Sequence, residues 1–353
     1  MIELLALDQS ALEAVLVDLG YPAYRGRQVY QWLYHRGAAE FDLMTDLPRD
    51  LRAKLKSACT ISLPQIVATR ESADGETVKF LLSYADGVNV EAVLMRYRRG
   101  ESRNRNTLCL STQAGCAMDC AFCASSILGL TRNLQAGEIV AQMLIAQQYL
   151  REHDLGELTN LVYMGMGEPL ANWSQVWASI ELANSALHIG MRRITVSTCG
   201  LVPAIRKLAG LKAQFTLAVS LHSPDNDVRS RLMPVNRRYP IEELFTALDE
   251  YTAATGRRVT IEYALFKGLN DDSGPALARL LKGRLVHVNL ILANPVPERG
   301  LEPPAASKVK AFTEALEAQG VSFVFRESRG LDIDGACGQL RQSYEKLASP
   351  AGV

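Results

Sequence analysis

The chain has 353 residues, and its formal net charge at pH 7 is zero because 38 basic residues balance 38 acidic ones. This balance excludes proteins that attract nucleic acid through overall positive charge, so any RNA contact must come from a local patch. No apolar run approaches the roughly 20 residues that span a bilayer, and the N-terminus lacks the features of a signal peptide. We therefore expect a cytoplasmic protein, with no membrane segment, that has one large core and a small accessory domain.

Residues 1–70 are predicted to form the accessory domain, which we expect to be helical. Apolar residues recur there at the spacing of a helix, in two groups: Leu12, Val15, Leu16 and Leu19, then Val29, Trp32 and Leu33. Short amphipathic helices of this kind pack into a small module.

The segment 71–105 is predicted to be a β-hairpin linker, because strand-like runs over 77–84 and 88–95 flank the turn signal Asp86-Gly87. A basic run with one tyrosine and one opposing carboxylate follows: Arg96, Tyr97, Arg98, Arg99, Glu101, Arg103 and Arg105. Arginine forks pair with phosphates, and a tyrosine ring can stack on a base. The run indicates an RNA contact, although a solvated loop would explain it equally well.

Strands and helices alternate from residue 106 to residue 345, and a short tail, 346–353, follows. The predicted strands are 108–111, 161–164, 194–197, 217–221, 260–266, 286–292 and 321–325, with helices between them that include 136–150, 241–251 and 306–319. Such alternation predicts a parallel sheet with right-handed crossovers. The units are too few for a closed eight-stranded barrel, so we expect an α/β fold with a partial, open (β/α)6-type barrel. Its chemistry should gather at the carboxyl ends of the strands.

Three cysteines form the sharpest motif: Cys116, Cys120 and Cys123 have the spacing C-x3-C-x2-C, in the loop after the first predicted barrel strand. A 4Fe-4S cluster normally takes four protein ligands, so three thiolates leave one iron with an open coordination site. S-adenosylmethionine fills such a site through its amino and carboxylate groups. A zinc knuckle or buried free thiols are the alternatives, but zinc sites pair C-x2-C with a second pair or a histidine, and no histidine lies nearby. The spacing predicts a radical S-adenosylmethionine centre.

Several further segments, in the same order along the chain, resemble the radical S-adenosylmethionine adenine methyltransferases of the RlmN/Cfr family. They are the segments 25–28, 107–116, 129–134, 165–169, 220–222 and 332–340. The resemblance covers nearly the whole chain and implies a radical S-adenosylmethionine barrel preceded by an accessory domain that binds RNA. The basic run is longer than the short proline-containing turn usual in the family, which leaves the choice of RNA target open.

The resemblance assigns S-adenosylmethionine to residues at successive strand ends: Gly167, Glu168, Ser197, Ser220, Leu221, His222 and Asn294. Glu168 is expected near the amino group of the cofactor, because a carboxylate can receive an ammonium group. Without the resemblance, the glycine-rich segment would be only a tight turn. His222 would be a structural histidine, and Asn294 before a proline would be a turn former.

The resemblance also implies three catalytic residues. Cys337 is expected to carry the methyl group as an S-methylcysteine intermediate, and Cys109 is expected to be the resolving thiol that forms a transient disulfide with it. Glu91 is expected to accept the proton from the adenine. Core packing for the two thiols and an exposed strand position for Glu91 are the alternatives. Two other cysteines, Cys59 and Cys199, match no catalytic position of the family and are expected to be structural.

The expected reaction is methylation of an adenine carbon in RNA. Known members of the family methylate C2 or C8 of adenosine 2503 in 23S rRNA, and the C2 enzymes also modify adenosine 37 of some tRNAs. Arg329-Gly330 resembles the C2 enzymes. We expect a monomer that receives electrons from an external reductase such as flavodoxin or ferredoxin. The alternatives are a radical enzyme acting on another RNA, a peptide or a small molecule, and a non-enzymatic iron-sulfur redox or RNA-binding protein.

Overall fold

The computed structural model describes residues 1–99, 102–211 and 213–341, and the side chains at 99 and 102–104 are outside this description. The predicted tail, 346–353, and the last residues of the predicted barrel, 342–345, also lie outside the described residues. Within the described ranges, no helix is both long and apolar enough to cross a membrane.

Short helices form the N-terminal part, as predicted: α1 (Gln9–Asp18), α2 (Tyr24–Tyr30) with a π-helical turn (Gln31–His35) after it, and α3 (Arg49–Ala58). The Asp8 side chain caps α1 by accepting a hydrogen bond from the amide of Ala11 at 2.8 Å. A parallel pair of two-residue strands, β1 (Ile2–Glu3) and β2 (Cys59–Thr60), joins the beginning of this part to its end. The helices therefore end at Ala58, earlier than the predicted boundary at residue 70, and the large sheet begins a few residues after β2, at Gln65.

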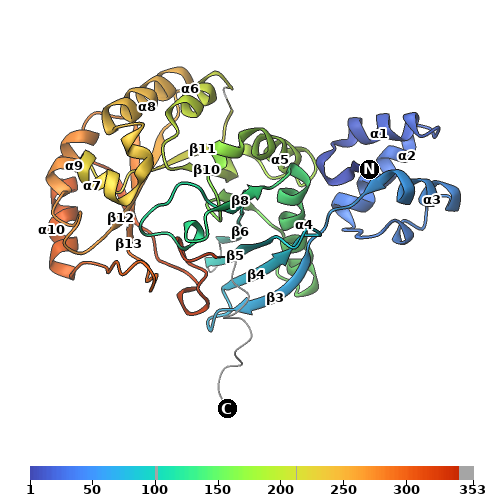
Figure 1. Cartoon of the computed structure of the whole chain (residues 1–353), viewed down its shortest axis with the longest axis horizontal. Coiled ribbons are helices and arrows are strands. Elements are labelled where there is room, and N and C mark those ends of the chain that lie inside the picture. The colour runs from blue at the N-terminus through green and yellow to red at the C-terminus, as the bar shows by residue number, and fades with distance from the viewer. Residues whose placement is uncertain (100–101, 212, 342–353) are drawn as a thin grey trace, which may run out of the picture.

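The core of these helices is continuous with two barrel helices. Buried leucines such as Leu12 and Leu33 share one apolar cluster with Val140 and Leu144 of α4 (Ala136–Glu152) and with Leu182 of α5 (Trp173–Ser185). Figure 1 shows the blue N-terminal helices at the side of the molecule where α4 and α5 lie. Because apolar surface is buried on both sides of the contact, the N-terminal helices are fixed to the barrel.

The described residues form a sheet of ten strands in the order β14-β13-β12-β11-β10-β9-β6-β5-β4-β3. Seven of these strands run parallel: β6 (Ser102–Cys109), β9 (Asn160–Tyr163), β10 (Ile194–Thr198), β11 (Thr216–Ser220), β12 (Val259–Leu265), β13 (Val286–Leu292) and β14 (Phe323–Phe325). The edge strands, β14 and β3, are not paired with each other among the described residues, so the barrel is open. The predicted open α/β barrel is confirmed.

The hairpin belongs to the same sheet. Strands β3 (Gln65–Glu71), β4 (Thr77–Ser83), β5 (Asn89–Arg99) and β6 are antiparallel neighbours, while the other edge of β6 pairs in parallel with β9. The sequence predicted the hairpin as a link; the structure adds that β6 starts earlier than expected and uses both of its edges. This pairing places Val93 of β5 opposite Cys109, at the end of the first barrel strand.

Helices cover the outer face of the parallel strands (Figure 1). After α4 and α5 these are α6 (Val202–Leu211), α8 (Ile241–Thr255), α9 (Gly274–Leu281) and α10 (Ala306–Glu317), whereas the short α7 (Asn226–Leu232) precedes α8 and shares an apolar cluster with Cys120. Each returns the chain so that the next strand begins at the same edge of the sheet, and the carboxyl ends of the strands therefore meet at the opposite edge.

Candidate active site

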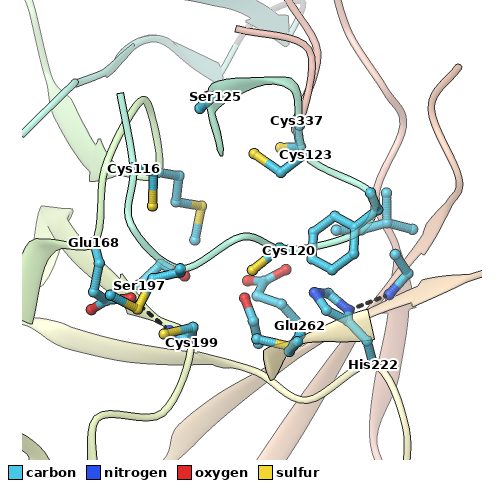
Figure 2. A pocket seen from close by; sticks show the side chains of 18 of the residues that line it. Cys116, Cys120, Cys123, Ser125, Glu168, Ser197, Cys199, His222, Glu262 and Cys337 are labelled. Carbon is cyan, nitrogen blue, oxygen red and sulfur yellow. Dashed lines mark hydrogen bonds between the residues drawn. The ribbon is translucent and has the colours of Figure 1, made fainter. Parts of the chain in front are cut away.

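A cavity of about 170 Å³, here called the larger cavity, lies at the carboxyl ends of the parallel strands. Ten of the predicted site residues line it: Cys116, Cys120, Cys123, Gly167, Glu168, Ser197, Ser220, His222, Asn294 and Cys337. In Figure 2 the three loop cysteines face the same space as Cys337, with Glu168 and Ser197 on one side and His222 on the other. Residues that are up to 221 positions apart along the chain, Cys116 and Cys337, therefore meet at one site.

The cysteine loop is held at both ends. It begins after β7 (Gln113–Gly115), which pairs with β8 (Leu130–Asn133), and the amide of Cys116 donates to the carbonyl of Gly129 at 3.0 Å. Gly115 has a φ of +77°, and a Cβ there would lie 1.9 Å from the same carbonyl, so only glycine fits. At the other end, the amide of Ala124 donates to the carbonyl of Gly338 at 2.7 Å. This last bond ties the cysteine loop to the loop that carries Cys337.

The thiols of this loop fit an iron-sulfur cluster better than a single zinc ion. Among the described residues, no group of three or more His, Cys, Asp or Glu side chains converges on a point where one metal ion would bind. Cysteine ligands of a 4Fe-4S cube bind different iron atoms and do not need to converge in this way. Burial raises the pKa of Cys116 to about 12 and raises that of Cys120 well above its usual range. Thiolates therefore form here only beside a compensating cation, which the irons of a cluster supply.

Glu168 is a buried carboxylate that suits an ammonium group. One of its oxygens accepts from the amide of Cys199 at 2.8 Å, and the other accepts from the amide of Leu170 at 3.0 Å. Burial raises the pKa of this carboxyl, and no Lys, Arg or His among the described residues forms an ion pair with it. A cationic group bound in the larger cavity would supply the missing charge.

Gly167 lines the larger cavity at a position where the structure itself requires glycine. In the structure, a Cβ on Gly167 would lie 2.6 Å from the Cβ of Gln113, and its φ is +101°. Contact with the neighbouring segment and backbone conformation therefore explain this glycine.

His222 and Asn294 have structural partners as well as a place on the cavity wall. The Nδ1 atom of His222 accepts from the amide of Ala264 at 2.9 Å, and burial lowers the pKa of the imidazole to about 3. The ring is therefore neutral and carries its proton on Nε2. The Asn294 side chain donates to the carbonyl of Cys337 at 2.9 Å, so it holds the Cys337 loop in addition to lining the larger cavity.

Leu221 differs from the other predicted residues. Its side chain is fully buried in the main apolar core and lines neither cavity described here. Its amide donates to the carbonyl of Glu262 at 3.1 Å, and its own carbonyl accepts from Arg229 at 3.2 Å. Only the backbone of Leu221 is therefore near the cavity wall.

A second cavity of about 60 Å³, here called the smaller cavity, adjoins the first, and Cys109 and Cys337 both line it. Cys109 is buried, while Cys337 is exposed, and neither forms a disulfide in the structure. Burial raises the pKa of Cys109, and the nearby Cys337 raises it further. The structure thus brings the two predicted catalytic thiols to one space beside the loop cysteines.

Comparison with known proteins decides the family. Residues 2–61 match the model of the ribosomal RNA large subunit methyltransferase N-terminal domain, and residues 110–281 match that of the radical SAM superfamily. A probable dual-specificity RNA methyltransferase RlmN of Pelotomaculum thermopropionicum is 48% identical over 342 residues, 95% of this chain and 90% of that protein. The chain belongs to the RlmN family.

Two further RlmN-family comparisons agree. A probable dual-specificity RNA methyltransferase RlmN of Desulfitobacterium hafniense is 45% identical over 343 residues, 96% of each chain. The crystal structure of a radical SAM methyltransferase from Sphaerobacter thermophilus superposes with a TM-score of 0.92 at 45% identity, covering 97% of this chain and 100% of that one. Membership confirms the predicted cofactors, a 4Fe-4S cluster with three cysteine ligands and S-adenosylmethionine.

Glu91 of this RlmN-family member lines neither cavity. It is buried in β5, where one carboxylate oxygen lies 3.1 Å from the Nζ of Lys79 and the other accepts from the amide of Arg341 at 2.8 Å. Burial raises the pKa of the carboxyl, and Lys79 opposes that shift. The alternative that Glu91 is an exposed strand residue is therefore wrong. Glu91, the expected catalytic base, is buried in an ion pair with Lys79 outside both cavities.

Glu262 lines both cavities, and the motifs did not point to it. It is buried in β12, accepts from the side chain of Asn289 at 2.8 Å and lies 4.0 Å from Arg326. Burial raises the pKa of this carboxyl, and Arg326 opposes the shift. The sequence did carry a signal for Glu262, because it is the only charged residue in a mostly apolar strand. Carboxylates are almost never buried without a partner, so such a residue marks a position with a specific role.

Cys199 lines the larger cavity and positions Glu168 through its amide, whereas Cys59 lies in the core of the N-terminal helices. Both were expected to be structural. The backbone amide and the side chain of Cys199 both hydrogen-bond to Glu168, and its carbonyl accepts from Arg229 at 2.8 Å.

The basic run is not a uniform surface. Arg96 is buried and donates to the carbonyl of Gly75 at 2.9 Å, so its role is structural, whereas Arg98 is exposed. The side chains of Arg99 and Arg103, and all of Glu101, lie outside the described residues. Tyr97 was expected to offer a face to a base, but guanidinium groups of two arginines lie over its ring.

Proposed function

We propose that this chain methylates C2 of adenine in RNA, at adenosine 2503 of 23S rRNA and at adenosine 37 of tRNA, through a methyl group carried on Cys337. One observation carries the proposal: Cys109 and Cys337 both line the smaller cavity. The larger cavity, which the three loop cysteines line, lies next to it. The alternative of a radical enzyme acting on a peptide or small molecule does not account for these two further thiols. The family membership supports RNA as the substrate.

The proposed ligands of the cluster are Cys116, Cys120 and Cys123. Proposed contacts of S-adenosylmethionine are the carboxylate of Glu168 for its amino group, the backbone at Leu221, and side chains or backbone at Gly167, Ser197, Ser220, His222 and Asn294. When bound, cluster and S-adenosylmethionine together supply a carbon-centred radical, and S-adenosylmethionine also supplies the methyl group.

The residues of the chain place the methyl group and release the product. Cys337 holds the methyl carbon as a thioether, on a loop fixed by Asn294 and by the bond from Ala124 to Gly338. The Cys109 thiolate then forms a disulfide with the Cys337 sulfur, which breaks the bond between that sulfur and the transferred carbon. The carbon keeps the electron pair of that bond and takes up a proton, which completes the methyl group. An external reductase returns the two electrons that reduce the disulfide. Desolvation raises the pKa of Cys337, and the charge of Arg326 opposes that shift and so favours the thiolate.

Glu91 is proposed as the acceptor of the proton that leaves the adenine carbon. Its raised pKa makes it a stronger base than an exposed carboxylate. Leu340, the residue before Arg341, lines the smaller cavity, so a shift of this segment would release the carboxylate oxygen that Arg341 now binds and open it toward the base.

The remaining parts of the proposal concern partners. The helical residues 1–70 are proposed to bind RNA, and flavodoxin or ferredoxin is proposed to supply electrons. A monomer acting in the cytoplasm, where rRNA and tRNA are found, is the proposed form of the enzyme. The match of residues 2–61 to a domain named for rRNA methyltransferases supports the first of these points.

The test is mass spectrometry of nucleosides from a 23S rRNA fragment and a tRNA, each treated with the anaerobically loaded enzyme and a reductant. The proposal expects 2-methyladenosine in both RNAs. Formation of 8-methyladenosine would contradict the C2 assignment, and unmodified RNA together with rapid cofactor cleavage would contradict RNA as the substrate. The Cys337→Ala variant is the matched control, because it keeps all three proposed cluster ligands.

A further inference from the structure

A stack of three side chains at the rim of the smaller cavity joins the hairpin to the C-terminal loop. The guanidinium carbon of Arg105 lies 3.9 Å from the centre of the Tyr97 ring, and that of Arg329 lies 4.3 Å from it. Two guanidinium groups this close to one ring cannot share a face, because their size and like charge keep them apart. Each therefore covers one face, and the ring has no open face left for a base.

The stack is attached to the cavity wall. Tyr97 of β5 and Arg105 of β6 are directly paired residues in the antiparallel register, so their side chains lie on the same side of the sheet. The hydroxyl of Tyr97 donates to the sulfur of Met95 at 3.8 Å, and both residues line the smaller cavity together with Arg329 and the two thiols. The stack thus has a fixed position at the entrance to the space where the proposed chemistry occurs.

Arg105 is the unpaired cation of this stack. Arg329 forms an ion pair with Glu76, and the nearby Arg326 lies 4.0 Å from Glu262. Arg105 has no carboxylate within ion-pair distance among the described residues, and its Nε is buried with no hydrogen-bond partner. No described carboxylate therefore neutralises the charge of Arg105, and the donors of its guanidinium group suit an anionic ligand.

We propose that Arg105 binds a backbone phosphate next to the target adenosine, and that Tyr97 is the positioning residue that fixes the plane of its guanidinium group. This proposal rests on the proposed function, since it takes the substrate to be RNA.

The chemistry of a nucleotide explains why the ligand is a phosphate. When the base enters the smaller cavity to reach Cys337, the ribose and the flanking phosphates stay outside, at the rim where the stack lies. A guanidinium group presents its donors in a planar fork that matches two phosphate oxygens. Stacking on Tyr97 restricts that fork to one plane, which reduces the conformational entropy lost on binding.

The first measurement is RNA affinity as a function of salt, with the loaded holoenzyme and a synthetic 23S rRNA hairpin that contains the target adenosine. Arg105→Gln is expected to lower the slope of log K against log salt by about 0.7, the value for one phosphate contact in a single strand. Tyr97→Leu should give a similar loss, while Tyr97→Phe, which keeps the ring, should not. The matched control is Arg238→Gln, an exposed arginine that lies 5.5 Å from the ring centre of Tyr239 and lines neither cavity.

The second measurement identifies the phosphate. Hairpins that carry a neutral methylphosphonate on the 5′ or the 3′ side of the target adenosine are compared for wild type and Arg105→Gln. If Arg105 contacts one of these phosphates, removing its charge should weaken wild-type binding but cost Arg105→Gln nothing further. A structural role of Arg105 would not produce this coupling at a single phosphate.

The assignment of Arg105 would be overturned if Arg105→Gln and each methylphosphonate weakened RNA binding additively at both phosphates. If the enzyme still methylates the unmodified hairpin, the proposed function would remain intact. A salt slope for Arg105→Gln equal to that of Arg238→Gln would overturn it as well. Failure of the wild type to methylate any of these RNAs would instead end the proposed function, and the phosphate assignment with it.

Discussion

The larger and the smaller cavity share Met164, Glu262, Ile291 and Cys337, yet different parts of the chain build them. Loops and last residues of successive parallel strands supply most of the larger cavity, including the cysteine loop and Glu168. The smaller cavity takes Met95 and Tyr97 from the interior of β5 and Arg326 from the segment after β14. The larger cavity is therefore a feature of the barrel, whereas the smaller one depends on pairing the hairpin with the barrel sheet.

The difference separates two tasks. Side chains of the larger cavity can hold a cluster and a small cationic ligand without any help from the hairpin. The smaller cavity exists only where β6 joins the antiparallel strands to the parallel ones. Variants in the two regions should therefore fail at different steps, and the expected effects below run from the largest to the smallest.

The largest expected effect belongs to the larger cavity. Cys120→Ala should lose all cluster-bound iron, because a three-ligand site that loses one ligand holds the cube poorly. Its control is Cys199→Ala, a second buried cysteine on the same wall, which keeps the amide bonded to Glu168 and should retain its iron. Iron content per chain after anaerobic reconstitution measures both. Equal iron in the two variants would contradict the assigned ligand set.

The ion pair behind the smaller cavity should have the next largest effect, on stability. Lys79→Met leaves the buried Glu91 carboxylate without its cation and should lower the free energy of unfolding by about 3–5 kcal/mol. Lys267→Met is the control, because its partner Glu302 is exposed and such pairs contribute about 0–1 kcal/mol.

The decrease in the free energy of unfolding that Lys79→Met causes should depend on pH. Folding raises the pKa of Glu91, so the folded state holds this proton more tightly than the unfolded state. The free energy of unfolding therefore falls as the pH rises from about 4.3 through the raised pKa, and without Lys79 it should fall further. Denaturant titrations of wild type and Lys79→Met at pH 5 and pH 8 test this. An equal decrease in the free energy of unfolding at both pH values would contradict a charged Glu91.

Asn294 lines the larger cavity and holds the loop of Cys337, and its removal should have a moderate effect. Asn294→Ala loses the bond to the Cys337 carbonyl and should slow methyl transfer about tenfold, which corresponds to about 1.4 kcal/mol. Ser328→Ala removes only the hydroxyl that donates to Asn294 at 2.6 Å and should have a smaller effect. Single-turnover assays measure both rates, and a larger loss in the serine variant would contradict the role of Asn294 in holding the loop.

At neutral pH the smallest expected effect concerns His222, because its contribution appears only below about pH 6.5. Its pKa of about 3 keeps the ring neutral in the folded state, while the unfolded state takes up a proton below about 6.5. The histidine therefore lowers the free energy of unfolding as the pH falls from 6.5 toward 3. His222→Gln should flatten this dependence, and calorimetry between pH 4 and pH 7 would show it. An unchanged slope would indicate that His222 is protonated in the folded protein.

Sequence reasoning reached the larger cavity because its residues come in short local patterns. C-x3-C-x2-C is complete within eight positions, and the resemblance assigned Glu168, Ser197 and Ser220, which follow or end predicted strands. Leu221 was assigned by the resemblance alone, and its side chain points into the core, since one residue at a strand end reverses the side-chain direction.

The smaller cavity could not be read in this way. Glu262 and Arg326 meet across two different strands, and Tyr97 lies between arginines from β6 and from the C-terminal loop. The hairpin was predicted, but its pairing with the first barrel strand was not, because β6 uses both of its edges. That unpredicted pairing places Arg105 beside Tyr97, and Arg329 covers the same ring from the C-terminal loop.

The most direct test of the central claim, that Cys337 carries the methyl group and Cys109 releases the product, is the fate of the RNA in Cys109→Ala. Methyl loading of Cys337 and attack on the adenine do not need the Cys109 thiol, but release does. The account predicts a covalent adduct between protein and RNA through Cys337. It should survive denaturing electrophoresis, disappear with ribonuclease and be absent from the Cys109→Ala, Cys337→Ala double variant. Normal turnover by Cys109→Ala with no trapped adduct would contradict it.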